Sequence, residues 1–228
     1  MMNKVLCSLL LFLSISCGLQ GRNANYARDS KRIWLDSKEI HHGEYVWKMK
    51  KAGDVISSAE KVSTLGYDTS DWLSAIVPGT VLNSLVYNKE YPEPYYGVNN
   101  KLESGKIPDI SKVGREFYTY WFRTEFDVPE SFAGKTIWLQ PDGVNYRAEI
   151  WVNGNLLSTL NGMFISDYIN VTDFVKVGRK NILAVKVYPV DVPGTTMPKS
   201  WGATGEFHNG GNGNIGLNTT MLMSVGWD

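Results

Sequence analysis

Short runs of alternating apolar and polar residues fill the stretch between Phe117 and Tyr188. A period of two places successive side chains on opposite faces of a β-strand, so each run predicts a strand with one buried face. Turn residues separate the runs at intervals of about ten residues, with little helical pattern between them. The stretch therefore predicts an all-β fold, an antiparallel β-sandwich with minor short helices.

The dipeptide Asn153-Gly154 is the clearest local feature within this stretch. A type I′ turn needs positive φ at both of its central residues, and Asn-Gly tolerates this best. We therefore expect a hairpin that joins strands at residues 146–152 and 156–160. The first of these strands is expected to turn its small and aliphatic side chains toward the core, namely Ala148, Ile150 and Val152.

Strands are also expected outside the hairpin. One is expected at residues 44–50, and another within residues 75–81, where Pro78-Gly79 stops it. The remaining strands are expected at residues 120–127, 136–140 and 181–188. Two of the expected strands show a clear core face. In the strand at 44–50 it is made by Tyr45, Trp47 and Met49, and in the strand at 181–188 by Leu183, Val185 and Val187.

Two segments upstream of the alternating stretch predict helix or loop. Residues 54–63 fit both a short helix and a loop. From Thr80, apolar residues recur at helical spacing, with Thr80 or Asn83 as N-cap. The prolines of Tyr91-Pro92-Glu93-Pro94 end this helix.

Three tyrosines surround those prolines, at Tyr91, Tyr95 and Tyr96. Aromatic side chains on a loop can form a face on which a sugar stacks. A loop packed down over the end of the sandwich is the more common arrangement, and we expect it here.

Positive and negative side chains balance, with 23 Lys plus Arg and 23 Asp plus Glu. Nucleic acids and anionic membranes attract proteins through a clustered excess of Lys and Arg. The balanced composition therefore predicts no nucleic-acid partner.

The N-terminus has the pattern of an export signal. Lys4 supplies the positive charge, and Val5–Ile15 forms an apolar run that is too short to span a membrane. We expect residues 1–21 to be a signal peptide, residues 22–31 a flexible spacer, and residues 32–228 the folded domain. The protein is therefore expected in the periplasm or at the cell surface.

Both cysteines, Cys7 and Cys17, lie within this leader, so the mature domain has no internal disulfide. Cys17 follows Leu13-Ser14-Ile15-Ser16 and precedes Gly18, which resembles the lipobox of bacterial lipoproteins, although the leucine lies one place early. Two alternatives remain: lipidation of Cys17, which would anchor the protein to a membrane, or ordinary cleavage between Ser16 and Asn23.

Several ordered motifs resemble the N-terminal sugar-binding-like domain of glycoside hydrolase family 2, a jelly roll of the galactose-binding-domain-like kind. They resemble the β-mannosidase and exo-β-glucosaminidase branch most, because of the Pro-Gly-Thr-Val and Tyr-Pro-Glu-Pro-Tyr-Tyr-Gly stretches. The motifs cover about 150 residues and lie at 72–81, 91–97, 120–126, 143–154, 171–172 and 178–187.

The resemblance implies that catalysis lies elsewhere. Enzymes of this family continue into an immunoglobulin-like domain and a barrel with two catalytic glutamates, and this sequence stops before both. Retaining glycosidases need two carboxyl groups about 5 Å apart. We expect no catalytic residue in this chain and no activity of the chain alone. Its strand acids are expected on the solvated sheet face, at Glu125, Asp127 and Glu149.

The glycine-rich tail ends with Trp227-Asp228. In related β-mannosidases a Trp-Asp pair on a loop of this domain touches the sugar, and the resemblance implies substrate binding by Trp227 and Asp228. The competing interpretation is a tryptophan that packs on the sandwich beside an exposed aspartate. Two functions follow: an accessory domain of an exported exo-β-glycosidase, or a free-standing carbohydrate-binding or surface module.

Other ligand sites have weak support. Residues 211–216 have the spacing of a dinucleotide fingerprint, but they lack the preceding strand and following helix that bind pyrophosphate. His41, His42 and His208 lack zinc-ligand spacing. We expect no cofactor and no metal. Because a sandwich without its usual neighbouring domains exposes apolar surface, we also expect self-association.

Overall fold

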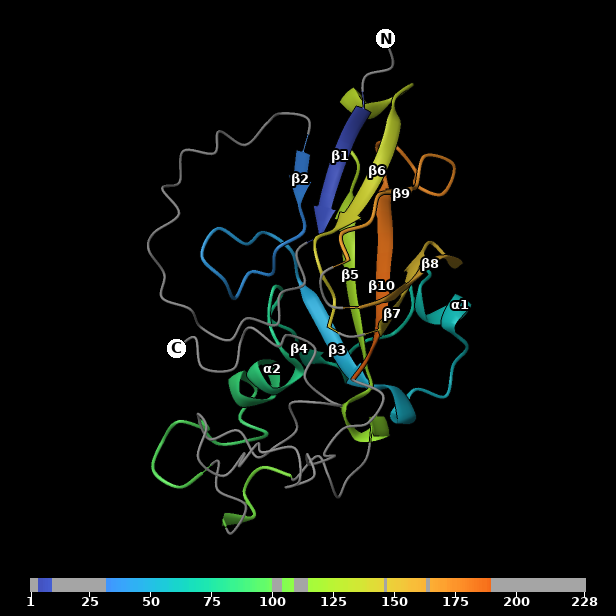
Figure 1. Cartoon of the computed structure of the whole chain (residues 1–228). Coiled ribbons are helices and arrows are strands. Elements are labelled where there is room, and N and C mark those ends of the chain that lie inside the picture. Colours follow the sequence, from blue (N-terminus) through green and yellow to red (C-terminus); the bar gives the residue numbers. More distant parts are fainter. Residues whose placement is uncertain are drawn as a thin grey trace, which may run out of the picture.

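The computed structural model describes residues 4–9, 32–99, 104–108, 115–145, 147–162 and 165–189. Two β-sheets form the body of this part of the chain (Figure 1). The strands are β1 (Lys4–Leu9), β2 (Arg32–Trp34), β3 (Trp47–Lys51), β4 (Leu73–Ser74), β5 (Tyr120–Asp127), β6 (Thr136–Pro141), β7 (Arg147–Val152), β8 (Asn155–Asn161), β9 (Ile169–Asn170) and β10 (Lys180–Tyr188). The helices are η1 (Ala52–Asp54), α1 (Ala59–Val62), α2 (Val81–Tyr87), η3 (Arg115–Tyr118) and η4 (Glu130–Phe132).

The larger sheet has six strands in the order β4-β3-β5-β10-β7-β8. All of its neighbouring strands are antiparallel. The central pair, β5 and β10, runs in continuous register from Asp127 opposite Lys180 to Tyr120 opposite Val187. The predicted antiparallel β-sandwich is confirmed.

The smaller sheet has four strands in the order β2-β1-β6-β9. β1 lies between β2 and β6 and is parallel to both, whereas β6 and β9 are antiparallel. β1 belongs to the leader predicted for residues 1–21. A chain without residues 4–9 would therefore leave β2 and β6 without their shared neighbour.

The main core fills the space between the two sheets. Alternation on each strand delivers the inward residues, as predicted. Trp47, Met49, Ile150 and Val185 are fully buried, and Ile137 and Leu139 of β6 meet them from the other sheet. No helix in the described part of the chain is long and apolar enough to cross a membrane.

The predicted Asn-Gly hairpin is present between β7 and β8. Asn153 has φ of 48° and Gly154 has φ of 88°, the positive values that a type I′ turn requires. The Asn153 side chain also accepts a hydrogen bond from the Ile182 backbone N–H (2.9 Å) and donates to the Phe174 carbonyl (2.7 Å). The turn is therefore tied to β10 and to the segment before it.

The strand predicted within residues 75–81 is wrong, because the structure has only the two-residue β4 at Leu73–Ser74. Serine hydroxyl oxygens accept the hydrogen bonds that backbone N–H groups of this segment would donate to a neighbouring strand in a sheet. Ile76 N–H donates to Ser84 Oγ (3.0 Å), and Val77 N–H donates to Ser37 Oγ (3.0 Å). The alternation in the sequence therefore reflects burial of Ala75 and Val77 without a β-ladder.

The predicted helix after Thr80 is confirmed as α2, and Thr80 is its N-cap. Its Oγ1 accepts a hydrogen bond of 2.8 Å from the Asn83 backbone N–H. The segment that fitted helix or loop contains both, since α1 occupies Ala59–Val62 within an otherwise irregular connection.

Candidate functional site

The outer face of the six-stranded sheet carries a polar and aromatic row that crosses three strands. Lys186 of β10 lies opposite Trp121 of β5 on one side and Glu149 of β7 on the other. One step along, Tyr188 lies opposite Arg147. These residues alternate with core residues such as Val185 and Ala148, so strand geometry turns them outward.

Part of this face is covered. The connection between β3 and β4 crosses it and buries a second, smaller apolar cluster, made of Val62, Trp72, Trp121, Trp151 and Ala184. Tyr67 packs edge to face on Trp72, with ring centroids 6.0 Å apart. The covering explains why β5 is buried on both faces.

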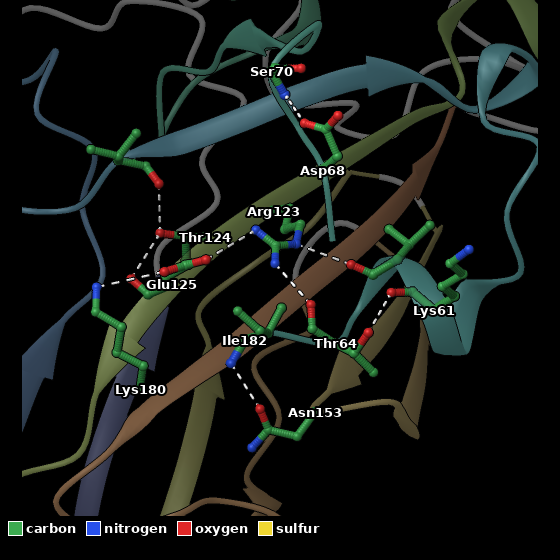
Figure 2. A network of polar contacts seen from close by, with 12 residues as sticks. Lys61, Thr64, Asp68, Ser70, Arg123, Thr124, Glu125, Asn153, Lys180 and Ile182 are labelled. Carbon is green, nitrogen blue, oxygen red and sulfur yellow. Dashed lines mark hydrogen bonds and ion pairs between the residues drawn. The ribbon is translucent and has the colours of Figure 1, made fainter. Parts of the chain in front are cut away.

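Arg123 of β5 binds the connection between β3 and β4 that covers this part of the sheet. Its Nε donates to the Val62 carbonyl (3.0 Å), and its Nη2 donates to the Thr64 carbonyl (2.9 Å). Figure 2 shows the guanidinium between these carbonyls and Glu125, whose Oε1 lies 3.7 Å from Arg123 Nη1. Burial lowers the pKa of Arg123, an effect that Glu125 opposes. Because these contacts join the connection to β5, Arg123 is a structural residue.

Beside this covered part, the described residues line a hollow of about 390 Å³. We call it the outer hollow. The two short helices η1 and η3 contact each other near the end of β10 (Figure 1), and Ala52, Gly53 and Glu116 of these helices line the outer hollow. Its lining consists of Ala52, Gly53, Glu116, Thr119, Arg147, Lys186 and Tyr188.

Aromatic rings support the two cations of the outer hollow. The Arg147 guanidinium carbon lies 4.2 Å from the centre of the Tyr188 ring. The Lys186 ammonium lies 5.2 Å from the same ring and 5.6 Å from that of Trp121. Such contacts hold a cation by attraction to the ring face and leave N–H donors free to meet a ligand.

Glu149 is not simply a solvated acid of the sheet face, as the sequence predicted. Its Oε1 accepts from the Tyr188 hydroxyl (2.5 Å), and its Oε2 accepts from the Trp151 indole N–H (3.2 Å). Glu125 likewise meets Arg123 and Lys180. Asp127 is exposed, as expected.

The tyrosine-rich segment divides between core and surface. Tyr91 packs against the main core, as expected for a loop over the end of the sandwich. Tyr95 and Tyr96 are 85% and 76% exposed, so the expected packing is wrong for them. Burial raises the pKa of Tyr118 and of Tyr120 to about 12, with a smaller contribution from Tyr91.

The sequence-predicted ligand residues Trp227 and Asp228, and the predicted lipidation site Cys17, lie outside the described residues. The 211–216 glycine motif also lies outside them. The last described residue is Pro189, directly after Tyr188 of the outer hollow. Among the described residues, no three His, Cys, Asp or Glu side chains gather closely enough to hold a metal ion.

A family model described as "Glycosyl hydrolase 2 galactose-binding domain-like" matches residues 47–228. This match covers most of the chain and includes the six-stranded sheet, strands β6 and β9 of the smaller sheet, the lining of the outer hollow and the tail sequence. The chain belongs to the glycosyl hydrolase 2 galactose-binding domain-like family.

Curated relatives of this glycosyl hydrolase 2 domain are glycosidases. A mannosylglycoprotein endo-β-mannosidase of Lilium longiflorum is 38% identical over 160 residues, which is 70% of this chain and 16% of the lily protein. An exo-β-D-glucosaminidase of Amycolatopsis orientalis is 29% identical over 149 residues, covering 64% of this chain and 13% of that enzyme. The chain therefore spans only about a sixth of the relatives it matches.

A solved structure of the same kind supports the fold. The exo-chitosanase of Amycolatopsis orientalis, in complex with PNP-β-D-glucosamine, shares 28% identity with a TM-score of 0.53. The match covers 64% of this chain and 16% of the exo-chitosanase. The chain is thus an N-terminal domain of the glycosyl hydrolase 2 type, as the motifs predicted.

The lining of the outer hollow was not singled out from the sequence. The signal available was weak: Arg147-x-Glu149 and Lys186-x-Tyr188 place polar residues opposite the apolar face of two adjacent strands. Such residues are normally solvated. Only the pairing of β7 with β10, and the approach of η1 and η3, bring them together.

Proposed function

We propose that this chain is the N-terminal accessory domain of an exported exo-β-glycosidase of glycoside hydrolase family 2. The domain would shape the sugar pocket, while catalytic glutamates lie on a further domain. The match over residues 47–228 carries this proposal, because the relatives are glycosidases of which such a domain is about a sixth.

Trp227 and Asp228 are the residues we assign to sugar contact. A tryptophan face packs on the C–H groups of a pyranose ring, and a carboxylate accepts hydrogen bonds from two adjacent hydroxyls. Neither group supplies the acid or the nucleophile of a retaining mechanism, which requires two carboxyl groups about 5 Å apart. Their contribution is to bind and orient the sugar.

Mutation in the full reading frame tests this assignment. With an aryl β-mannoside or aryl β-glucosaminide as substrate, Trp227→Ala and Asp228→Asn should each lower kcat/KM by roughly tenfold or more, as expected when a charge-assisted or stacking contact is lost. Lys180→Gln, on exposed sheet surface, should leave kcat/KM unchanged. Equal kcat/KM in all variants would exclude a role for the pair.

The isolated chain provides a second test. It should not hydrolyse either aryl glycoside, because it carries no assigned catalytic carboxylates. Detectable turnover, retained after repurification, would overturn the accessory role.

Export and lipid anchoring are part of the same proposal. The charged start at Lys4 and the apolar run Val5–Ile15 support export, and Ser16-Cys17-Gly18 supports acylation. Palmitate labelling and membrane retention should both be lost in Cys17→Ser if Cys17 is the acylated residue. Export without labelling in either protein would instead indicate ordinary cleavage.

A free-standing carbohydrate-binding module is the second candidate, and the outer hollow favours it because that hollow is a ligand-sized site within this chain. The nucleotide sequence after Asp228 distinguishes the two. An open reading frame into an immunoglobulin-like domain and barrel supports the accessory domain, whereas an immediate stop codon supports the free module.

A further inference from the structure

We propose that the outer hollow binds a sugar acid, with the carboxylate of a hexuronate residue held by Arg147 and Lys186. This inference concerns residues of the sheet face and does not depend on Trp227 or Asp228. It requires only that the described sandwich is folded, so it can fail while the proposed accessory function holds, and the reverse.

The outer hollow has the size of a small-ligand site and walls that are fixed. Its volume of about 390 Å³ falls at the lower end of the range for small-molecule pockets, roughly 300–1,000 Å³. The Ala52 N–H of η1 donates to the carbonyl of Thr119, the residue directly after η3 (2.8 Å), and so joins these two walls. Arg147 and Tyr188 face each other across a regular strand pair. The site is therefore formed before a ligand arrives.

Positive charge dominates the lining. Arg147 and Lys186 supply two cations against the single carboxylate of Glu116. In the part of the chain that the structure describes, neither cation lies within ion-pair distance of a carboxylate, and the contacts recorded for both are with aromatic rings. A guanidinium offers paired N–H donors that match a carboxylate, and an adjacent ammonium adds a second positive contact.

Among the described residues, the neighbouring acid Glu149 forms no ion pair with either cation. Glu149 lies opposite Lys186 on β7, but its two oxygens accept from Tyr188 and Trp151. These hydrogen bonds direct the Glu149 carboxylate to its aromatic neighbours and fix the Tyr188 ring beneath Arg147. Glu149 therefore positions the Tyr188 ring on which the Arg147 guanidinium lies.

The arrangement favours an anion that also carries hydroxyl groups. A neutral sugar binds largely by stacking on an aromatic face, but Arg147 lies over the Tyr188 ring at 4.2 Å. The exposed Glu116 carboxylate on the rim can accept hydrogen bonds from hydroxyls, which a simple anion lacks. In a hexuronate, the carboxylate would contact Arg147 and Lys186, and the ring hydroxyls would donate to Glu116.

Titration of the 228-residue chain with D-glucuronate and D-galacturonate tests the proposal, with D-glucose and acetate as matched probes. Calorimetry reports binding, and a change in tryptophan fluorescence, to which Trp121 beside Lys186 contributes, gives a second readout. At least one uronate should bind about tenfold more tightly than glucose or acetate. Binding should weaken as salt rises, because the hollow is open to solvent.

Three variants separate the contributions. Arg147→Gln should weaken uronate binding about tenfold or more, and Arg147→Lys should restore only part of it, since lysine keeps the charge but loses the paired donors. Gly53→Phe should block binding by filling space, because a Cβ at Gly53 meets no atom within 4 Å. Lys180→Gln removes the same charge outside the hollow and should leave binding within twofold.

Several outcomes would overturn the proposal. Equal binding of glucose and uronate would exclude a charge-selective site, and equal binding of acetate would show an adventitious anion site. Uronate binding unchanged in both Arg147→Gln and Gly53→Phe would place any binding elsewhere. Circular dichroism of each variant establishes that the compared proteins are folded.

Discussion

The Arg123 guanidinium donates to the carbonyl oxygen of Val62 at 3.0 Å, across 61 residues of sequence. This contact joins the central strand β5 to the segment that covers the outer sheet face. It divides that face into a closed part over the tryptophan cluster and the open outer hollow.

Loss of the Arg123 side chain should destabilise the domain. Arg123→Met leaves the Val62 and Thr64 carbonyls without their donors, and we expect a loss of about 3 kcal/mol in the free energy of unfolding. Urea unfolding measures it. Lys180→Gln breaks only a half-exposed ion pair with Glu125 and should cost less than about 1 kcal/mol. A similar loss in both variants would argue against a special role for Arg123.

The Asn153 turn should be more sensitive than its backbone conformation alone requires. Asn153→Gly keeps the positive φ but loses the contacts to Ile182 and Phe174, so we expect a loss of about 2 kcal/mol. Gly154→Ala, at φ of 88° and with its new Cβ 3.3 Å from Thr64 Cγ2, should cost about 1 kcal/mol or more through backbone strain and this tight contact. Equal unfolding midpoints for Asn153→Gly and the parent would show that these hydrogen bonds add nothing.

Gly43 and Gly53 should respond oppositely to alanine. A Cβ at Gly43 would lie 1.5 Å from the Ser37 carbonyl oxygen, whereas one at Gly53 meets no atom within 4 Å. Gly43→Ala is therefore expected to cost more than about 3 kcal/mol, and Gly53→Ala to remain within about 0.5 kcal/mol of the parent. Thermal unfolding of the two variants compares them directly, and a well-folded Gly43→Ala would contradict the tight approach.

Stability should fall at high pH because of Tyr120, which is buried, and Tyr118, which is partly buried. In the folded domain the pKa of Tyr118 and of Tyr120 is raised to about 12, against about 10 in an unfolded chain. Below pH 10 both states keep these hydroxyls protonated. Between about pH 10 and 12 the unfolded state ionises first, so the free energy of unfolding decreases as pH rises.

Denaturant titrations at several pH values measure this decrease. Tyr120→Phe should make the pH dependence shallower. Tyr95→Phe, whose side chain is 85% exposed, should leave it unchanged. A free energy of unfolding that stays constant from pH 10 to 12 would contradict the burial effect.

Deletion of residues 1–21 should alter association. β1 pairs with β6 from Lys4 opposite Thr136 to Leu9 opposite Pro141, so its removal opens two strand edges. Open edges pair readily with other chains. Sedimentation velocity should show more self-association for the shortened chain than for the intact one. A concentration-independent monomer in both would contradict the expected self-association.

Local sequence pattern accounts for much of the fold. Alternation in the sequence identified β3, β5, β6, β7 and β10, and Asn153-Gly154 identified the hairpin between β7 and β8. Both predictions succeed because strand and turn geometry depend on neighbouring residues. The strand expected within 75–81 failed for a tertiary reason. Ser37 and Ser84, distant in sequence, take the N–H groups of Val77 and Ile76.

The sequence alone therefore determined the sandwich, its core face and its family motifs. Tertiary structure decided which residues of the outer sheet face are covered and which line the outer hollow. A period of two shows that Trp121, Lys186 and Arg147 point away from the core, but it does not show which of them is covered. Trp121 lies under the segment held by Arg123, whereas Lys186 and Arg147 line the outer hollow. Contacts between distant segments make that difference, and no local pattern encodes them.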